Sequence, residues 1–166
     1  MKVEVFFDYT CPYCLKGHEI LMELLPEYPE LEIVWRPCEA HPRPENYSPH
    51  SDLCVRGMLY AKEIGVEILD YHKKVYEAIF EKRENIENPQ ILAEVVAELI
   101  NPEAFLGMLN EGKYEKELYE NNKLAWETYA FPAVPSFYMN GEKLTAVPNV
   151  GLTKEAMKTF IEKNRQ

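Results

Sequence analysis

The stretch FFDYTCPYCLKG, residues 6–17, decides the fold, because it places two cysteines where a strand gives way to a helix. Residues 2–8 (KVEVFFD) are rich in β-branched and aromatic side chains, which is typical of a buried strand. From Pro12 onward the apolar positions recur at helical spacing, and proline suits a first helical turn because an N–H there would have no partner. Cys11 therefore stands at the predicted helix start, and Cys14 lies about one turn inside it.

Three further segments have strand patterns. Residues 31–37 (LEIVWRP) alternate and predict a second strand, parallel to the first because a helix connects the two. Residues 134–139 (VPSFYM) and 142–147 (EKLTAV) flank the dipeptide Asn140–Gly141, the strongest short signal for a tight hairpin. The sequence thus predicts a βαβ unit near the start of the chain and a hairpin near its end.

The middle of the chain is helical in pattern throughout, from about residue 50 to residue 130. A last helix is expected after Thr153, whose hydroxyl suits the N-cap position. We therefore predict an α/β domain formed by residues 1–49 and 131–166, interrupted by a helical insertion over residues 50–130.

Composition and charge exclude several classes of partner. Among 166 residues, Lys and Arg total 18 against 28 Asp and Glu, a net charge of -10 that disfavours nucleic-acid binding. The sequence has no signal-peptide pattern and no run of about 18 apolar residues, so we expect a cytoplasmic protein without a membrane partner. Cysteine pairs in that compartment are more often catalytic or metal-binding than structural.

The C-x-x-C spacing of Cys11 and Cys14 has three interpretations: a metal site, a structural disulfide or a redox pair. A structural zinc site usually has four ligands, and the remaining cysteines, Cys38 and Cys54, do not form a second such pair. Convergence of the four scattered thiols, with His18 or His41, stays open. Because the pair lies between a strand and a helix start, a redox pair is favoured and no metal site is predicted.

The helix start gives the two thiols different roles. Unpaired N–H groups and the positive end of the helix dipole stabilise a thiolate, which is the form that attacks disulfides. Cys11 is therefore predicted to be the exposed nucleophile. Cys14, deeper in the helix, is predicted to be the resolving thiol that attacks Cys11 and releases a mixed disulfide.

The segment AVPSF, residues 133–137, predicts the second part of the site. Pro135 opens a strand, and we predict a cis peptide bond that holds a backbone edge beside Cys11. Val134 would then offer its N–H and C=O to an extended substrate. A trans proline at a strand start is the simpler alternative.

Further substrate contacts are predicted from residues near these motifs. Pro12 and Tyr13 lie between the two cysteines, and Tyr9 lies just before them. His41, in the loop EAHP, either borders the pocket or serves a turn.

FFDYTCPYC, VWRPCEAHP and AVPSF follow one another along the chain in an order that resembles the thioredoxin superfamily, and its DsbA-like branch in particular. The details are similar to FrnE-type proteins and their relatives, the 2-hydroxychromene-2-carboxylate isomerases and kappa-class glutathione transferases. The resemblance implies a thioredoxin fold (βαβ + ββα) with a large all-helical insertion and dithiol–disulfide exchange. It also implies Cys11 as nucleophile, Cys14 as resolving thiol and Pro135 as cis-proline.

One departure concerns a buried acid. Thioredoxin and DsbA carry it six residues before the first cysteine, where this chain has Val5. Asp8, three residues before Cys11, matches the FrnE-like and isomerase pattern instead. Two interpretations of Asp8 stay open: a surface or loop-capping carboxylate, or a functional one.

The sequence therefore predicts a thiol–disulfide oxidoreductase acting on disulfides of proteins or small molecules. The alternative is a glutathione-dependent isomerase or transferase. Such isomerases resemble this opening but typically carry serine at the first active-site position, and serine cannot form a disulfide, so Cys11 with Cys14 favours redox exchange. No cofactor is predicted beyond glutathione as a redox partner. Cys38 and Cys54 are expected to be small buried hydrophobes, with a second redox relay or a regulatory disulfide as the alternative.

Overall fold

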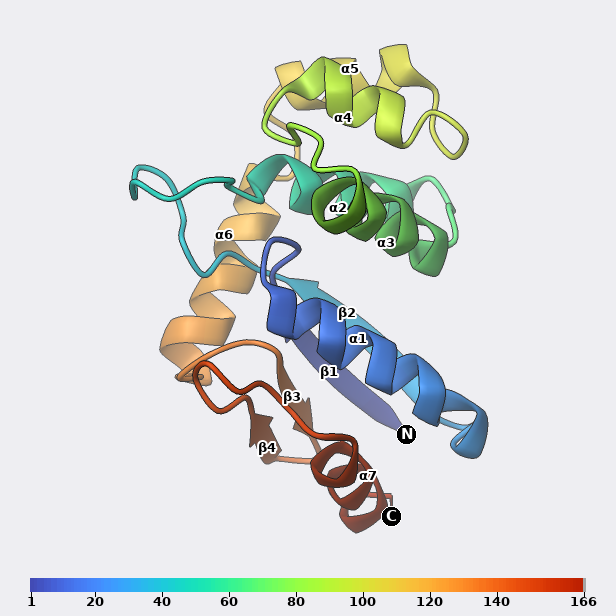
Figure 1. Ribbon diagram of the computed structural model, residues 1–166, viewed down its shortest axis with the longest axis vertical. Coiled ribbons are helices and arrows are strands. Elements are labelled where there is room, and N and C mark those ends of the chain that lie inside the picture. The colour runs from blue at the N-terminus through green and yellow to red at the C-terminus, as the bar shows by residue number, and fades with distance from the viewer. Residues whose placement is uncertain (166) are drawn as a thin grey trace. The chain divides into compact units, whose positions relative to one another are not determined.

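The computed structural model describes residues 1–165, and its elements follow the predicted order (Figure 1). The chain forms two compact units. The first consists of Met1–Ala40 together with the chain from Asn121 onward, and the second consists of His41–Glu120.

The first unit contains a four-stranded sheet in the order β2-β1-β3-β4. Its strands are β1 (Lys2–Phe7), β2 (Glu32–Pro37), β3 (Ser136–Met139) and β4 (Glu142–Thr145). β1 runs parallel to β2 and antiparallel to β3, and β4 is antiparallel to β3. The predicted hairpin is confirmed: Asn140 and Gly141 join β3 to β4 with φ values of 50° and 84°, as a type I′ turn requires.

Helices α1 (Pro12–Leu24) and α7 (Lys154–Lys163) pack together on one face of this sheet, and the 3₁₀ turn η1 (Leu25–Glu27) ends α1 (Figure 1). The apolar face of α1 is buried, and so is that of α7, where Phe160 lies 6.4 Å from the Phe137 ring of β3. The predicted cap of α7 is confirmed, because the Thr153 hydroxyl accepts a hydrogen bond from the Ala156 N–H at 3.1 Å.

The opposite face of the sheet is covered by the chain that follows α6 (Glu115–Lys123). This helix continues into a π-helical turn, η3 (Leu124–Thr128). Beyond it, the rings of Tyr129 and Phe131 pack on Phe6 at 5.6 and 5.0 Å. Glu4 on this face accepts hydrogen bonds from Arg36 at 2.8 Å and from the Tyr129 hydroxyl at 3.1 Å.

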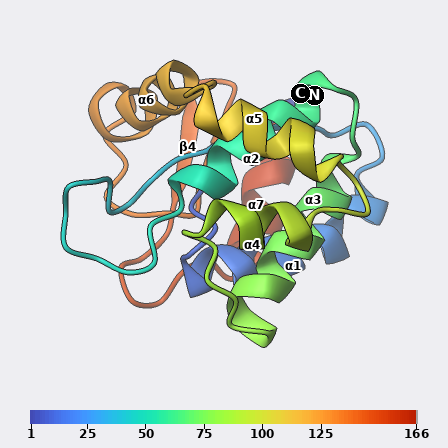
Figure 2. The same cartoon turned by 90° about the horizontal axis from the view of Figure 1, so that it is seen from above.

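The second unit contains only helices. They are α2 (Asp52–Glu63), α3 (Ile68–Tyr76) with its π-helical continuation η2 (Glu77–Glu81), α4 (Pro89–Val95) and α5 (Pro102–Asn110). α4 packs against α5 and α2 packs against α3 (Figure 2). Asn88 and Asn101 cap α4 and α5 through their side-chain oxygens, and a proline follows each at the first helical position.

Both unit boundaries fall earlier in the chain than the predicted domain boundaries at 49/50 and 130/131. Hydrogen bonds explain the first difference. Arg43 bonds to Asp52 at 3.1 Å and to Glu87 at 2.9 Å, and His50 bonds to Glu87 at 2.9 Å. The loop after Ala40 is therefore held by α2 and by the turn that precedes α4.

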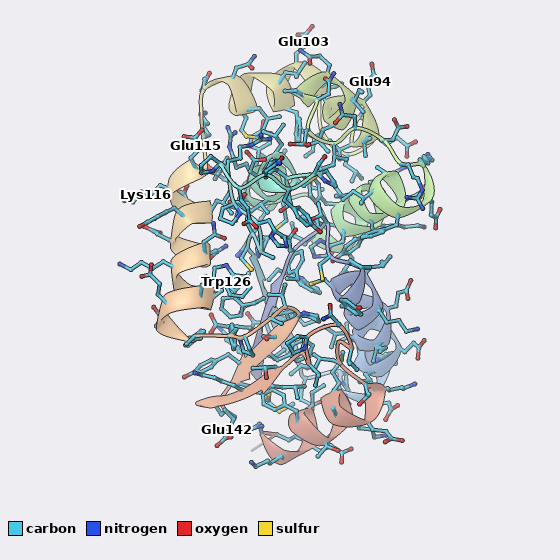
Figure 3. All side chains as sticks on the ribbon, turned by 60° about the vertical axis from the view of Figure 1, so that its left-hand side comes forward. Glu94, Glu103, Glu115, Lys116, Trp126 and Glu142 are labelled. Atoms are coloured by element: carbon cyan, nitrogen blue, oxygen red, sulfur yellow. The ribbon has the colours of Figure 1, made fainter. Side chains whose placement is uncertain are left out.

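The second boundary has a similar cause. The Asn121 amide donates to the Pro37 carbonyl at 3.0 Å, and the Trp126 indole N–H donates to the Glu39 carbonyl at 2.9 Å. Figure 3 shows Trp126 on the side of its helical segment that faces the sheet. Residues 121–130 therefore belong with the strands, although their sequence pattern is helical.

No helix among the described residues 1–165 is long and apolar enough to cross a membrane.

Gly57 provides a test of packing in the second unit. A Cβ atom at this position would lie 2.2 Å from the Tyr71 hydroxyl and 2.8 Å from the Phe105 ring. Both rings are fully buried, so Gly57→Ala should lower the free energy of unfolding by about 1–3 kcal/mol in urea denaturation. The control is Gly107→Ala, because nothing lies within 4 Å of its added Cβ. That helix substitution should stabilise the protein by up to about 1 kcal/mol, and equal effects at both sites would contradict the packing described here.

Candidate redox site

Cys11 stands where β1 ends and α1 begins. Its extended backbone (φ −89°, ψ 118°) makes it the N-cap residue of α1. Its carbonyl accepts hydrogen bonds from the N–H groups of Cys14 and Leu15 at 3.1 and 3.2 Å, and its own N–H donates to the Asp8 carbonyl at 3.1 Å. The side chain is only partly buried. The predicted position at the start of the helix is thus confirmed.

The environment of Cys11 favours its thiolate. Its pKa is lowered, chiefly because the Cys14 thiol donates a hydrogen bond to the Cys11 sulfur. The backbone N–H groups of Cys14 and Tyr13 at the helix start also donate to this sulfur. Partial burial and the negative charge of Asp8 act in the opposite direction but do not cancel these hydrogen bonds.

Cys14 has the opposite character. It is buried, and burial raises its pKa well above the ordinary value, helped by its hydrogen bond to Cys11. The Asp8 N–H lies 3.4 Å from the Cys14 sulfur and donates to it. The pair therefore combines one accessible thiol with a lowered pKa and one enclosed thiol with a raised pKa. All four cysteines are free thiols in the structure.

The segment before β3 lies directly beside this pair. The Val134–Pro135 peptide bond is cis, as predicted from the sequence. The Val134 carbonyl oxygen lies 3.9 Å from the Cys11 sulfur. Two hydrogen bonds fix the segment, from Ala146 N–H to the Pro135 carbonyl at 3.1 Å and from the Ser136 hydroxyl to the Ala133 carbonyl at 2.7 Å.

Gly17 makes this approach sterically feasible, and the sequence interpretation missed it. A Cβ atom at Gly17 would lie 2.9 Å from Cγ of Pro135, which real Cβ contacts do not allow. Only a glycine in this turn of α1 lets the proline ring pack against the helix. An isolated glycine inside a helical pattern was the available signal, since it usually marks a close approach.

Three predicted substrate contacts lie near the nucleophile along the chain, but in different environments. Pro12 is exposed, and Tyr13 is 36% exposed. Tyr13 also packs over Gly151, where an added Cβ would lie 3.2 Å from the tyrosine ring. Tyr9 is fully buried and packs edge-on against Phe7 at 5.0 Å, so its side chain belongs to the core and not to a surface that a substrate meets.

The histidines occupy separate environments. His41 belongs to the second unit, where its ring stacks on Tyr47 at 3.8 Å and its Nδ1 lies 2.8 Å from Glu45. His18 lies on α1, 5.7 Å from the Trp35 ring, and burial lowers its pKa to about 4. His18 is therefore a neutral packing residue of the first unit near pH 7.

The remaining cysteines are buried. Cys38 follows β2, its N–H donates to the Phe7 carbonyl at 2.8 Å, and burial raises its pKa well above the ordinary value. Cys54 lies on α2 in the second unit and is fully buried. Within residues 1–165 no three His, Cys, Asp or Glu side chains are grouped so that they could hold a metal ion.

Comparison with known proteins adds to this geometry. Residues 2–158 match the sequence model of the DSBA-like thioredoxin domain. The chain belongs to this family. Family membership confirms the predicted thioredoxin fold with a helical insertion and the DsbA-like resemblance, and it makes the chain a relative of thiol oxidoreductases. The FrnE-type assignment within the family stays a prediction.

Individual relatives are distant. The uncharacterized protein YwbO of Bacillus subtilis is 25% identical over 173 residues, which cover 82% of this chain and 86% of YwbO. A structure described as a probable DsbA oxidoreductase from Streptomyces coelicolor matches with a TM-score of 0.83 and 16% identity, covering 99% of this chain and 90% of that one. A 2-hydroxychromene-2-carboxylate isomerase matches with a TM-score of 0.73 and 15% identity, covering 98% and 94%. These structural matches show the shared fold.

Gly17→Ala should separate Pro135 from α1. The added methyl must push the proline ring away, so we expect the free energy of unfolding to fall by about 1–3 kcal/mol in urea. The Val134 carbonyl should move with the ring, and the rate of disulfide exchange should fall. Gly107→Ala on α5 serves as the matched helix substitution. Unchanged stability and rate in Gly17→Ala would refute the contact.

The lowered pKa of His18 predicts that the protein loses stability in acid. Its pKa is about 4 when folded against 6.5 ordinarily, so below pH 6.5 the unfolded chain binds a proton that the folded chain excludes. Stability should therefore fall as pH drops from about 6.5 toward 4. His18→Gln removes this contribution. Between pH 6.5 and 4 the free energy of unfolding of the variant should therefore fall by about 1–3 kcal/mol less than that of the wild type. A pH series of urea denaturation measures this, with His41→Gln as control; identical pH profiles for His18→Gln and wild type would exclude the effect.

Proposed function

We propose that the protein is a thiol–disulfide oxidoreductase with Cys11 as nucleophile and Cys14 as resolving thiol. The observation that carries the proposal is the asymmetry of the pair. Hydrogen bonds at the helix start lower the pKa of the accessible Cys11, whereas burial raises the pKa of Cys14. An accessible thiol with a lowered pKa beside an enclosed thiol with a raised pKa suits attack on a disulfide followed by resolution.

The reaction follows from this arrangement. The Cys11 thiolate attacks one sulfur of a substrate disulfide, and the other substrate sulfur leaves as a thiolate that takes up a proton. Cys14 then loses its proton, attacks the Cys11 sulfur and releases the second substrate thiol. Two electrons pass to the substrate, and a Cys11–Cys14 disulfide remains. The same steps in reverse oxidise a dithiol substrate, so the recycling partner sets the direction.

The surroundings of Cys11 support an extended peptide as substrate. The Val134 backbone lies beside the sulfur, directly before β3 enters the sheet, where an additional extended chain can form backbone hydrogen bonds. Pro12 and Tyr13 offer exposed apolar surface next to it. We propose these three residues as substrate contacts and leave out the buried Tyr9; a role for His41 stays a prediction.

The compartment, the substrates and the cofactor requirement of the protein are likewise proposed. We propose that the protein works in the cytoplasm on disulfide-containing proteins or small thiols. It would need no bound cofactor, and glutathione would act as a redox partner in solution.

A glutathione-dependent isomerase or transferase is the second candidate, favoured by the structural similarity to a 2-hydroxychromene-2-carboxylate isomerase. It predicts saturable glutathione binding that survives Cys14→Ser. Calorimetry at millimolar glutathione distinguishes the two proposals, because absence of binding argues against the isomerase.

Insulin reduction with dithiothreitol tests the leading proposal. Cys11→Ser should abolish the catalysed rate, because no thiolate remains to attack. Incubated with insulin in the absence of dithiothreitol, Cys14→Ser should accumulate a mixed disulfide, visible as a mass increase that added reductant removes. Cys54→Ser, a buried thiol of the second unit, is the control and should match the wild type. If Cys11→Ser reduced insulin as fast as the wild type, the proposal would be wrong.

A further inference from the structure

We propose that Asp8 is the positioning residue of this site: its buried carboxylate fixes the cysteine loop and biases the Cys11–Cys14 pair toward the disulfide. The inference rests on the proposed redox function and adds a determinant of its direction. The sequence leaves two interpretations of Asp8, a surface or loop-capping carboxylate or a functional one. The residue is only 2% exposed, which excludes the surface position, and its hydrogen bonds with Thr10 agree with loop capping.

The Asp8 carboxylate joins two segments that follow neighbouring strands. Its Oδ1 accepts hydrogen bonds from the N–H and the hydroxyl of Thr10, each at 3.0 Å. Its Oδ2 accepts a hydrogen bond from the Ala40 N–H at 2.8 Å. Three donors satisfy a charged carboxylate in a buried place, where an unpaired charge would be costly. The side chain therefore locks the turn before Cys11 to the chain that leaves β2.

The Asp8 backbone contacts both cysteines. Its carbonyl accepts the Cys11 N–H at 3.1 Å, which orients the N-cap of α1. Its own N–H donates to the Cys14 sulfur at 3.4 Å. Side chain and backbone of one residue thus fix the loop from both ends. A carboxylate held this way keeps a constant position relative to both sulfurs.

The charge of this carboxylate acts on the thiols of the site. The Asp8 carboxylate raises the pKa of Cys11 and of Cys14, but less than hydrogen bonds and burial change them. At Cys14 the Asp8 N–H, which donates to the sulfur, acts in the opposite direction and lowers the pKa. The carboxylate also raises the pKa of Cys38, second only to burial. These directions agree with the geometry, because a buried negative charge close to a sulfur makes a thiolate there less favourable.

A bias in the redox equilibrium follows. When Cys11 is a thiolate, the reduced pair carries a negative charge on that sulfur, whereas the disulfide carries none. A nearby carboxylate therefore destabilises the reduced form and favours the disulfide, which makes the pair a better reductant. Substituting a neutral side chain should stabilise the reduced form and make the pair more oxidising.

The test is equilibration of the full-length protein in glutathione redox buffers at pH 7, with the disulfide fraction read by thiol trapping. Asp8→Asn keeps an oxygen for Thr10 and removes the charge. We expect its equilibrium constant for oxidation by glutathione disulfide to fall about tenfold, equivalent to about 30 mV for this two-electron couple. Its Cys11 thiolate, followed by ultraviolet absorbance, should form at lower pH than in the wild type.

Thr10→Val provides the matched control, since it removes the hydroxyl donor but leaves the charge in place. It should stay within about twofold of the wild-type constant, because loosening one hydrogen bond does not change the charge at the site. A second neutral variant, Asp8→Ser, can still accept from the Thr10 N–H and should shift the constant in the same direction as Asp8→Asn.

Several outcomes would overturn the inference. An unchanged constant in Asp8→Asn would exclude the charge effect, and an equal shift in Thr10→Val would show that only loop order matters. If neither Asp8→Asn nor Asp8→Ser folded, Asp8 would be a structural residue only. A wild-type pair that fails to exchange with glutathione at all would instead refute the proposed function, so the two failures are distinguishable.

Discussion

The site depends on one constraint, the contact of helix α1 with Pro135. Gly17 lets the proline ring lie where any larger residue would collide with it, and this places the Val134 carbonyl 3.9 Å from the Cys11 sulfur. The helix start stabilises the thiolate, and the proline segment supplies a backbone edge beside it. In the proposed function, separation of these two elements would remove the backbone edge that aligns the substrate beside Cys11.

In the proposed exchange reaction, Cys11 and Cys14 divide two tasks that a single cysteine could not combine. Ready ionisation and reaction with a partner require an accessible sulfur with donors around it, which Cys11 has. Later release of the partner requires a second sulfur that stays protonated until the mixed disulfide exists, which burial gives to Cys14. Through hydrogen bonds, Asp8 connects the Cys14 sulfur and the Cys11 N–H to the chain that follows β2. The cysteine loop is thus tied to the chain that leaves the edge strand β2.

Much of the fold and of the core site could be predicted from the sequence, because local chemistry determines those parts. Pro12 marks the helix start, Asn140–Gly141 marks the hairpin, and the spacing of Cys11 and Cys14 marks the pair. The parts that sequence could not reveal depend on contacts between distant segments. Tyr9 and Tyr13 both lie close to the cysteines in the sequence, but Tyr9 is buried in the core. Asp8 is also buried, and its carboxylate accepts a hydrogen bond from Ala40, thirty-two residues further along the chain. The helical pattern of residues 121–130 also gave no sign that its partner is the sheet.

Hydrogen bonds between Glu39 and Asn122 join the points where the chain leaves and re-enters the first unit. The chain leaves the first unit at Ala40 and returns to it at Asn121. Just beside these two points, the Asn122 side chain accepts a hydrogen bond from the Glu39 N–H at 2.7 Å and donates one to its carboxylate at 3.1 Å. The exit and return points are therefore fastened to each other by residues of the sheet unit itself. An insertion anchored in this way can change in length or sequence during evolution while the strands, the cysteine helix and the proline segment keep their geometry.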